Sequence, residues 1–410
     1  MMDFQKIYEF YLILYFHRNY EDDLYLNNKG YSLMEVYSYL NQVYQYLCGE
    51  ELDISFPVNQ TKVFDFFNGF FRYTLLNDDI KEAYDELTKD GSEQYLMDHF
   101  DTINEKVLAT LEMAQHFKDS KCSDLPKMTH GELETLFREF LMYIDPEGDY
   151  SQIFEKMQQE GKLIYYDALD EKQKEFFYKC FGIDGKLRNF FLPIDDDNAL
   201  LFVNREETIG DFQSLAHEFA HYVSFETKGD KGSANILAEF PSIFYELLAC
   251  SFLLKKGYDS KKVNECYHSR YQEISETYNL VNCVSRYFKM YRDHGDITRE
   301  NDIEDSANQA ILYIEKYGAE HYKELLKQKP SLANPELMAD NYCDLANAYL
   351  TRDPNYVGRK YPYIIGLYLA TKKFGELKGN PKVLETMKNI TMNLFTVDLD
   401  SLFFDASEKR

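Results

Sequence analysis

The chain has 410 residues, of which 45% are hydrophobic and 16% aromatic, and its formal net charge at pH 7 is −25. This length and apolar content allow a large buried interior, so we expect one large lobe or two closely associated lobes. Binding to the phosphate backbone of a nucleic acid needs a concentrated basic face, and this acidic chain has none. We therefore predict no nucleic-acid partner.

The cysteines and the N-terminal segment bear on the compartment. The seven cysteines are scattered and never form a C-x-x-C pair, which is typical of free thiols in a reducing environment. The apolar run at 10–16 follows Asp3 and Glu9 and lacks the basic start of a signal peptide. No stretch reaches the length that spans a bilayer. We therefore expect a cytoplasmic protein without a membrane partner.

Most of the chain has the periodicity of amphipathic helices with short connections. Apolar residues recur three and four apart over 132–144 and again over 170–182, and the chain has only 10 Pro and 19 Gly. The pattern predicts an all-α fold. We divide it into an N-terminal helical lobe over 1–130 and a helical domain over 131–410 that carries the motifs described below.

The segment 145–150, Asp-Pro-Glu-Gly-Asp-Tyr, alternates acidic residues as calcium-binding loops do. It lacks the glycine at the sixth position and the glutamate at the twelfth that such a loop requires. We interpret it as a solvated turn.

One segment departs from the helical pattern. Two apolar runs in 187–204 flank a turn rich in Pro, Asp and Asn, which predicts a small antiparallel β hairpin. If its second strand, 199–204, lies at a sheet edge, an extended peptide can add to it by backbone pairing, with Phe202 and Asn204 as substrate-binding residues. A hairpin that other elements cover is the alternative.

The strongest motif is His-Glu-x-x-His at 217–221, within a continuous helical pattern. A helix advances about 1.5 Å and turns about 100° per residue, so His217 and His221 share one face and can converge on one ion. Glu218 lies about 100° further round, beside the ion, where it can act as a general base on a water molecule. The alternative is two histidines on a helix face beside a solvated glutamate.

A catalytic zinc ion needs a third protein ligand, and the next predicted helix offers candidates. Glu239 and Glu246 stand seven residues apart in an otherwise apolar stretch, so both project from the same side of a helix. Burying a carboxylate in such a stretch is costly without a cation. The two glutamates therefore favour a metal site.

The segment 198–247 resembles the core of the metallopeptidases grouped around oligoendopeptidase F and thimet oligopeptidase. In that family a strand ending in Asn precedes a polar loop, an L-x-H-E-x-G-H helix, and a second helix with E-x-P-S or E-x-x-S and a later Glu. Here LLFVN, REETIGDFQS, LAHEFAH and AEFPSIFYE follow one another in that order. The likeness covers roughly residues 130–400 and is strongest over the two metal-binding helices.

The resemblance implies a role for each matching residue. His217, His221 and Glu239 match the ligands of one Zn²⁺ ion. Glu218 matches the general base, and Glu246 matches a later acid that orients a ligand histidine.

The segment RKYPYIIGLYLA at 359–370 resembles the tyrosine- and glycine-rich segment that closes over the substrate in this family. It implies that Tyr361 and Tyr368 donate hydrogen bonds to the oxyanion, with Tyr363 as a further substrate-binding candidate. With 35 tyrosines in the chain, simple packing is the alternative for each of them.

Several features depart from the family pattern. Ala220 replaces the glycine of H-E-x-G-H, Ser224 replaces a frequent further histidine, and no histidine stands near Asn355 before the tyrosine segment. The N-terminal region is also shorter than in the family. These differences concern the cleft wall and the stabilisation of the transition state, and they leave the ligand set unchanged.

We therefore predict two helical lobes around a deep substrate cleft, with one zinc ion on its floor and a small β hairpin or sheet beside the HExxH helix. The predicted activity is that of a gluzincin-like metalloendopeptidase, which hydrolyses internal bonds of short, unstructured peptides. A zinc exopeptidase and an inactive, peptide-binding helical scaffold are the alternatives.

Overall fold

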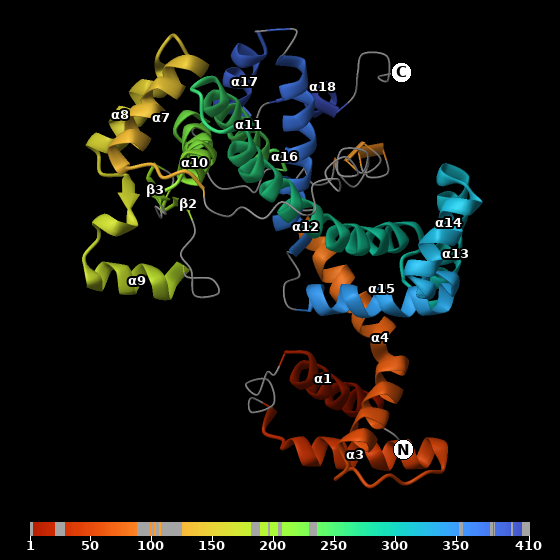
Figure 1. The fold of residues 1–410 in the computed structure, drawn as a ribbon. Coiled ribbons are helices and arrows are strands. Elements are labelled where there is room, and N and C mark those ends of the chain that lie inside the picture. The colour runs from red at the N-terminus through yellow and green to blue at the C-terminus, as the bar shows by residue number, and fades with distance from the viewer. Residues whose placement is uncertain are drawn as a thin grey trace. The chain divides into compact units, whose positions relative to one another are not determined.

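The structure is a computed structural model. It describes residues 3–20, 29–87, 95, 99, 102–103, 106–107, 125–181, 189–195, 197–203, 207–228, 236–351, 356–377, 380, 382–394 and 397–403. The fold is predominantly helical and contains one small β sheet (Figure 1). The predicted class, all-α with a small sheet, is confirmed.

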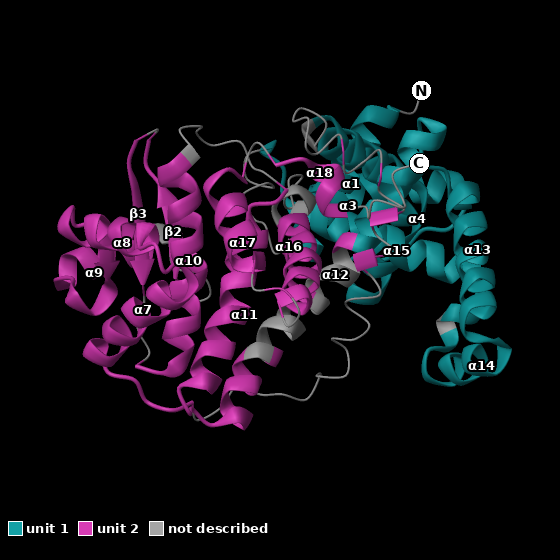
Figure 2. Ribbon diagram, turned by 90° about the horizontal axis from the view of Figure 1, so that it is seen from above, with its two compact units in different colours: residues 1–86, 282–357 teal, residues 87–281, 358–410 magenta. Residues whose placement is uncertain are grey.

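The chain divides into two compact units, which Figure 2 shows in different colours. Unit 1 comprises residues 1–86 and 282–357, and unit 2 comprises residues 87–281 and 358–410. The predicted boundary after residue 130 does not coincide with this division, because 282–357 pack with the first 86 residues. Helical periodicity marks where helices run, and it contains no information on which of them pack together.

Within the described residues, the regular elements of unit 1 are helices. They are α1 (Phe4–Tyr20), α3 (Leu33–Cys48), α4 (Pro57–Leu87), α13 (Arg299–Tyr317), α14 (Ala319–Gln328), the 3-10 helix η3 (Pro330–Ala333) and α15 (Pro335–Leu350). Helix α12 (Ser260–His294) continues from unit 2 into unit 1.

Unit 2 contains the sheet and the remaining helices. The helices are α7 (His130–Ile144), α8 (Asp149–Gln159), the 3-10 helix η2 (Tyr166–Ala168), α9 (Glu171–Phe181), α10 (Ile209–Lys228), α11 (Glu239–Lys255), α16 (Tyr356–Leu377), α17 (Lys382–Met392) and α18 (Leu399–Phe403). The strands are β1 (Leu163–Tyr165), β2 (Phe190–Pro193) and β3 (Ala199–Val203).

Two helices begin with reciprocal capping boxes that the local sequence dictates. Ser32 caps α3 and Thr129 caps α7: each hydroxyl accepts from the backbone N–H three residues on, at Glu35 and Glu132. Each glutamate in turn accepts from the backbone N–H of its capping residue, at 2.7 and 2.8 Å. Such caps satisfy N–H groups that no intrahelical carbonyl reaches and stabilise a helix by about 1 kcal/mol.

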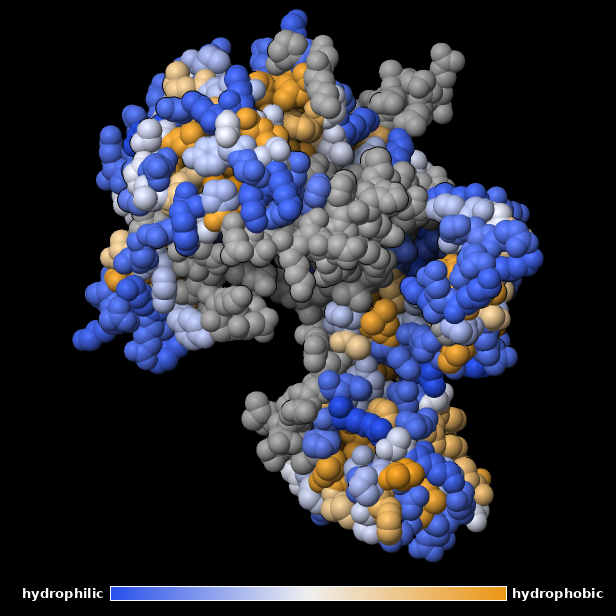
Figure 3. Space-filling view, in the orientation of Figure 1, coloured by the Kyte–Doolittle hydropathy of each residue, from blue (hydrophilic) through white to orange (hydrophobic). Residues whose placement is uncertain are grey.

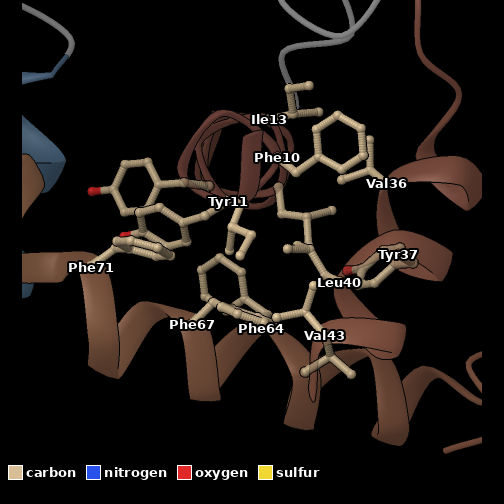
Figure 4. Packing of buried hydrophobic residues seen from close by; sticks show 14 of the residues in the cluster. Phe10, Tyr11, Ile13, Val36, Tyr37, Leu40, Val43, Phe64, Phe67 and Phe71 are labelled. Carbon is tan, nitrogen blue, oxygen red and sulfur yellow. The ribbon is translucent and has the colours of Figure 1, made fainter. Parts of the chain in front are cut away.

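Aromatic side chains fill the space between α1, α3 and α4 in unit 1 (Figure 4). The rings of Tyr11 and Phe71 lie 5.4 Å apart between centroids, and Phe67 stacks on Phe71 at 6.3 Å. The hydroxyl of Tyr11 donates to Oδ1 of Asn68 at 2.9 Å, since a buried phenol needs a partner. In a chain that lacks Trp, Phe and Tyr supply the aromatic side chains of this core, beside Ile, Leu and Val.

A buried polar cluster joins α4, α12 and α13 within unit 1. Asp302, at 0% exposure, accepts hydrogen bonds from the hydroxyls of Tyr73 and Tyr287, both at 2.9 Å, and forms an ion pair with Arg286. Arg286 also pairs with Asp305 at 2.5 Å. A buried carboxylate with this many donors is compensated for the loss of water.

The sheet of unit 2 has the strand order β1-β3-β2. Strands β2 and β3 pair antiparallel, with Phe191 opposite Leu201, as the predicted hairpin requires. Strand β1 pairs with β3 in parallel, with Ile164 opposite Phe202. Sequence analysis did not find β1, because three residues are too short to show an alternating pattern.

The sheet order makes β3 the central strand, so of the two alternatives for 199–204, a sheet edge and a covered strand, the sheet edge is wrong. Phe202, predicted to bind substrate, is 1% exposed and stacks on Phe190 with ring centroids 4.9 Å apart. Asn204, the other substrate-binding candidate on this strand, lies outside the described residues. Among the described strands, β1 and β2 are the two outer ones.

The acidic segment after α7 is more than a solvated turn. The carboxylates of Asp145, Glu147 and Asp149 surround Nζ of Lys388 on α17, at 2.7, 2.8 and 2.7 Å. Asp145 is buried and also accepts from the backbone N–H of Tyr150 at 2.9 Å. The ammonium group thus occupies the centre of the acidic cluster, and it comes from a residue far along the chain.

Helices α10 and α11 pack against each other in the middle of unit 2, next to α17 (Figures 1 and 2). From Glu239 to Cys250 every residue of α11 is buried. Aromatic residues of α7 and α8 cover α10: the ring of Phe137 lies 5.5 Å from that of Phe219, and the ring of Phe154 lies 5.7 Å from it. This packing gives α10 and α11 a fixed mutual position, which is what a shared site requires.

In the part of the chain that the structure describes, no helix has both the length and the apolar character needed to cross a bilayer. The face of the molecule in Figure 3 carries mainly hydrophilic side chains over α13 and α14.

Candidate metal centre

Helix α10 holds the two histidines of the motif. Before its first turn, Thr208 donates its backbone N–H to Oδ2 of Asp211 at 3.2 Å, and its hydroxyl accepts from the N–H of Gly210 at 3.2 Å. His217 and His221 follow on one face of the helix, and their Nε2 atoms lie 3.2 Å apart. The two imidazoles therefore point their Nε2 atoms at one place.

Helix α11 adds a carboxylate at that place. Oε2 of Glu239 lies 3.2 Å from Nε2 of His217 and 3.5 Å from Nε2 of His221. Zinc binds nitrogen and oxygen ligands at about 2.0–2.1 Å in tetrahedral geometry, so any two of its ligand atoms lie about 3.3 Å apart. The three observed distances thus fit one face of a zinc tetrahedron.

The chemistry of the three atoms also fits a metal ion. Glu239 is buried, and its Oε2 atom has no hydrogen-bond donor of good geometry among the described residues. If each imidazole donated an N–H to this oxygen, two N–H groups would stand 3.2 Å apart and repel each other. One divalent cation accepts a lone pair from all three atoms at once.

Glu246 contacts the other side of the His217 ring. Its Oε1 atom lies 2.6 Å from Nδ1 of His217, and both side chains are only 6% exposed. Nδ1 has no hydrogen bond of good geometry among the described residues, but a carboxylate this close stabilises a proton on Nδ1 electrostatically and leaves the Nε2 lone pair available to a cation.

The carboxylates of Glu239 and Glu246 determine the pKa of the His217 ring. Burial lowers the pKa of His217, but Glu246 and Glu239 outweigh it and raise the pKa to about 10. Burial raises the pKa of Glu239, while His221 and His217 hold it well below its usual range. The neighbouring carboxylates therefore favour the protonated form of the His217 ring, and a cation that bound here would displace that proton.

Glu218 lies beside this triangle on α10. A carboxylate oxygen of Glu218 lies within 4.8 Å of ligand atoms of both His217 and His221, and its side chain is partly exposed. Oε2 of Glu239 already lies 3.2 and 3.5 Å from the two Nε2 atoms, so we expect Glu218 to contact a water molecule rather than the ion.

Strand β2 borders the site. The ring of Phe191 is nearly parallel to that of His221, with centroids 6.2 Å apart and an angle of 24° between the planes, and it also contacts Phe225 at 5.5 Å. The sequence offers 199–204 as a peptide-binding strand only if it forms a sheet edge, and it does not single out Phe191. Its position in an apolar run before the turn was the only available signal.

Helix α16 carries the three candidate tyrosines. The face of α16 that contains Gly366 contacts Glu239. A Cβ atom at Gly366 would lie 2.8 Å from the carbonyl carbon of Glu239, so the two backbones touch. At about 100° per residue, Tyr363 lies about 60° from Gly366 around the helix axis, whereas Tyr361 and Tyr368 lie about 140° and 160° away.

The packing of the tyrosines agrees with this geometry. Tyr368 is 9% exposed and stacks on Phe403 of α18, with centroids 6.4 Å apart, and Tyr361 is 6% exposed. Tyr363 is partly exposed, and Nζ of Lys360 lies over its ring at 5.7 Å. Around the helix axis, Tyr363 therefore lies closer to Gly366 than the predicted pair does, and it is the more exposed phenol.

No protein-family model and no curated protein matches the sequence. Among solved structures, the chain is similar to a crystal structure from Chlamydophila abortus described as a "putative peptidase", with 16% identity and a TM-score of 0.48. The match covers 79% of this chain and 56% of that one, so the chain spans little more than half of the length of its neighbour. A likeness of this extent carries no functional argument, and the proposal below depends on the geometry of the site.

Proposed function

We propose that this protein is a zinc-dependent metallopeptidase in which His217, His221 and Glu239 are the protein ligands of one zinc ion. The observation that carries the proposal is the triangle of two Nε2 atoms and one Oε2 atom, with edges of 3.2, 3.2 and 3.5 Å. Three protein ligands with an open fourth position are the arrangement of catalytic rather than structural zinc sites.

The residues around the triangle have complementary roles. Zinc, when bound, makes a water molecule more acidic and polarises a carbonyl group. Glu218 takes a proton from the attacking water and delivers it to the leaving amine. Glu246 keeps the His217 ring in the orientation that binds the metal. Tyr363 donates a hydrogen bond to the carbonyl oxygen of the substrate as negative charge develops on it.

The proposed substrates are short, unstructured peptides cleaved at internal bonds. Strand β2 is an outer strand of the sheet, and Phe191 on this strand lies against His221. An extended peptide paired with the backbone of β2 would run past the metal ligands with little dependence on its side chains. The proposed peptide-binding strand is therefore β2 and not the central strand β3.

Metal content is the first test. The purified chain is expected to contain one zinc ion, to lose it in His217→Ala, and to retain it in His294→Ala, which removes an exposed histidine of α12. A wild-type chain without bound or bindable zinc contradicts the proposal.

Cleavage of a mixed peptide library is the second test. Wild type is expected to cut within peptides, and Glu218→Gln is expected to bind zinc and lose at least 100-fold in rate. Cuts confined to peptide ends indicate an exopeptidase, and zinc binding without any cleavage indicates a peptide-binding scaffold.

A further inference from the structure

Gly366 lies so close to Glu239 that no side chain fits between them. A Cβ atom built at Gly366 would lie 2.8 Å from the carbonyl carbon of Glu239, 2.9 Å from its carbonyl oxygen and 3.0 Å from its Cβ atom. Ordinary contact of a Cβ atom begins at 3.4 Å, so alanine at this position requires one of the two helices to move. All three neighbouring atoms belong to the backbone or its first side-chain carbon, and none can rotate away.

The contact falls on the first residue of α11. Glu239 is the first residue of the helix, and the preceding residue, Ala238, makes no side-chain capping hydrogen bond. Ala238 has helical backbone angles, and the N–H of Phe240 donates to the carbonyl of Leu237 at 2.9 Å, so a preceding turn leads into the helix and no side chain caps it. At Gly366 the backbone of α16 packs against this start of the helix.

We infer that Gly366 is a positioning residue for the third ligand of the metal centre, an inference that rests on the proposed function. Its missing side chain lets α16 support the backbone of Glu239 where Oε2 reaches the point between the two Nε2 atoms. A methyl group would shift that backbone by about 0.5 Å or more, and a reactive site tolerates about 0.5 Å. Gly366 therefore acts on the metal through Glu239.

Simple helix packing predicts a different result from the same substitution. If Gly366 only allows close contact, alanine lowers the stability of unit 2 and leaves zinc affinity unchanged. If Gly366 positions Glu239, alanine weakens zinc binding and changes the geometry around the metal. Metal affinity and the spectrum of a bound ion distinguish the two, and neither requires turnover.

The experiment compares Gly366→Ala with Gly375→Ala. Gly375 lies on the same helix, is exposed, and has no atom within 4 Å of a Cβ built there, so both variants gain the same helix propensity. Zinc affinity is measured by competition with a chromophoric chelator, and coordination by the visible spectrum of bound Co²⁺. We expect 10–100-fold weaker zinc binding and an altered Co²⁺ spectrum for Gly366→Ala, and wild-type values for Gly375→Ala.

A double-mutant cycle with Glu239→Gln tests whether the effect passes through the ligand. In the Glu239→Gln background, Gly366→Ala is expected to have no further effect on zinc affinity. An equal loss in both backgrounds overturns the inference, as does a Gly366→Ala variant with wild-type affinity and spectrum. A wild-type chain that binds no zinc overturns the proposed function and this inference with it.

A second variant, Glu239→Asp, tests the position of the carboxylate even if Gly366→Ala does not fold. Glu239→Asp retracts the carboxylate by one methylene group and leaves the backbone contact with Gly366 unchanged. It is expected to weaken zinc binding at least 10-fold with an unchanged unfolding temperature. Wild-type zinc affinity in Glu239→Asp shows that the position of this carboxylate is not critical and overturns the inference.

Discussion

Nδ1 of His217 lies 2.6 Å from Oε1 of Glu246, while Nε2 of the same ring lies 3.2 Å from Oε2 of Glu239. One imidazole of α10 thus bridges two glutamates that stand almost two turns apart on α11. The ring cannot rotate without breaking one of the two contacts. Helix α11 therefore contributes both a candidate ligand and the group that orients a second one.

Glu246→Gln is expected to weaken zinc binding 10–100-fold, because the amide no longer provides a charged acceptor for the Nδ1 proton of His217. The measurement is zinc affinity by competition with a chelator. Tyr245→Phe is the matched control on the same helix: it removes a buried hydroxyl that lies 2.8 Å from the hydroxyl of Tyr150. This variant should lose about 1 kcal/mol of stability and no zinc affinity. Equal zinc affinities in the two variants would contradict the orienting role of Glu246.

The local geometry of this site follows closely from the sequence. A four-residue spacing puts His217 and His221 on one helix face, and a seven-residue spacing puts Glu239 and Glu246 on one side of the next helix. Both spacings describe single helices, for which the rotation per residue is fixed. The observed contacts need only one further condition, that α10 and α11 lie side by side.

What depends on contacts between distant segments could not be predicted. Strand β1 is too short to show a pattern, so the sequence leaves open whether β3 lies at a sheet edge, and only the pairing with β1 makes it the central strand. Helix rotation alone could not rank Tyr361, Tyr363 and Tyr368, because the face that α16 turns to the site became visible only from the contact of Gly366 with Glu239. Lys388 lies far along the chain from the acidic segment that it neutralises.

Lys388→Ala tests whether the ammonium group of Lys388 stabilises the fold by neutralising the carboxylates of that acidic segment. Removing it leaves Asp145, Glu147 and Asp149 together with ligand oxygens within 4.8 Å of one another. Since Asp145 is buried, the loss of its partner is expected to cost about 3 kcal/mol of unfolding free energy. The measurement is thermal or urea-induced unfolding.

Calcium is expected to restore part of the stability that Lys388→Ala loses, because three converging carboxylates suit a hard divalent cation. Millimolar Ca²⁺ should raise the unfolding temperature of this variant and not that of wild type, whose cluster already holds an ammonium group. Lys382→Ala, at an exposed position on the same helix, should resemble wild type with and without Ca²⁺. A Lys388→Ala variant as stable as wild type would contradict the assignment.

Asp79→Asn is expected to change how stability depends on pH. Burial raises the pKa of Asp79 to about 7, although the hydroxyl of Thr351, at 2.6 Å, donates to the carboxylate and lowers it. The folded state thus holds a proton that the unfolded state releases near its ordinary value of 3.8. This contribution to stability is fully present below about pH 4 and is lost as the pH rises through about 7.

Asp79→Asn has no carboxyl group that ionises at this position. Its unfolding free energy relative to that of wild type should therefore rise between pH 5 and pH 8. One pKa unit corresponds to about 1.4 kcal/mol, and incomplete burial of Asp79 reduces the expected gain to about 1–2 kcal/mol. Urea-induced unfolding at both values of pH measures it. Asp78→Asn, which removes the neighbouring exposed carboxylate, is the control. A constant difference between Asp79→Asn and wild type across this range would rule out the ionisation of Asp79 as the cause.

Tyr363→Phe is expected to lower kcat about 100-fold and to leave zinc affinity unchanged, because a hydrogen bond made mainly in the transition state affects the rate and not the metal. Tyr363 is the candidate tyrosine nearest the face of α16 that Gly366 turns to Glu239, and it is partly exposed. Tyr368→Phe is the matched control, since Tyr368 stacks on Phe403 on the other side of the helix. Initial rates on one cleaved peptide, at saturating zinc, decide between the two tyrosines. A large loss of kcat in Tyr368→Phe and none in Tyr363→Phe would contradict the assignment of Tyr363 and favour Tyr368.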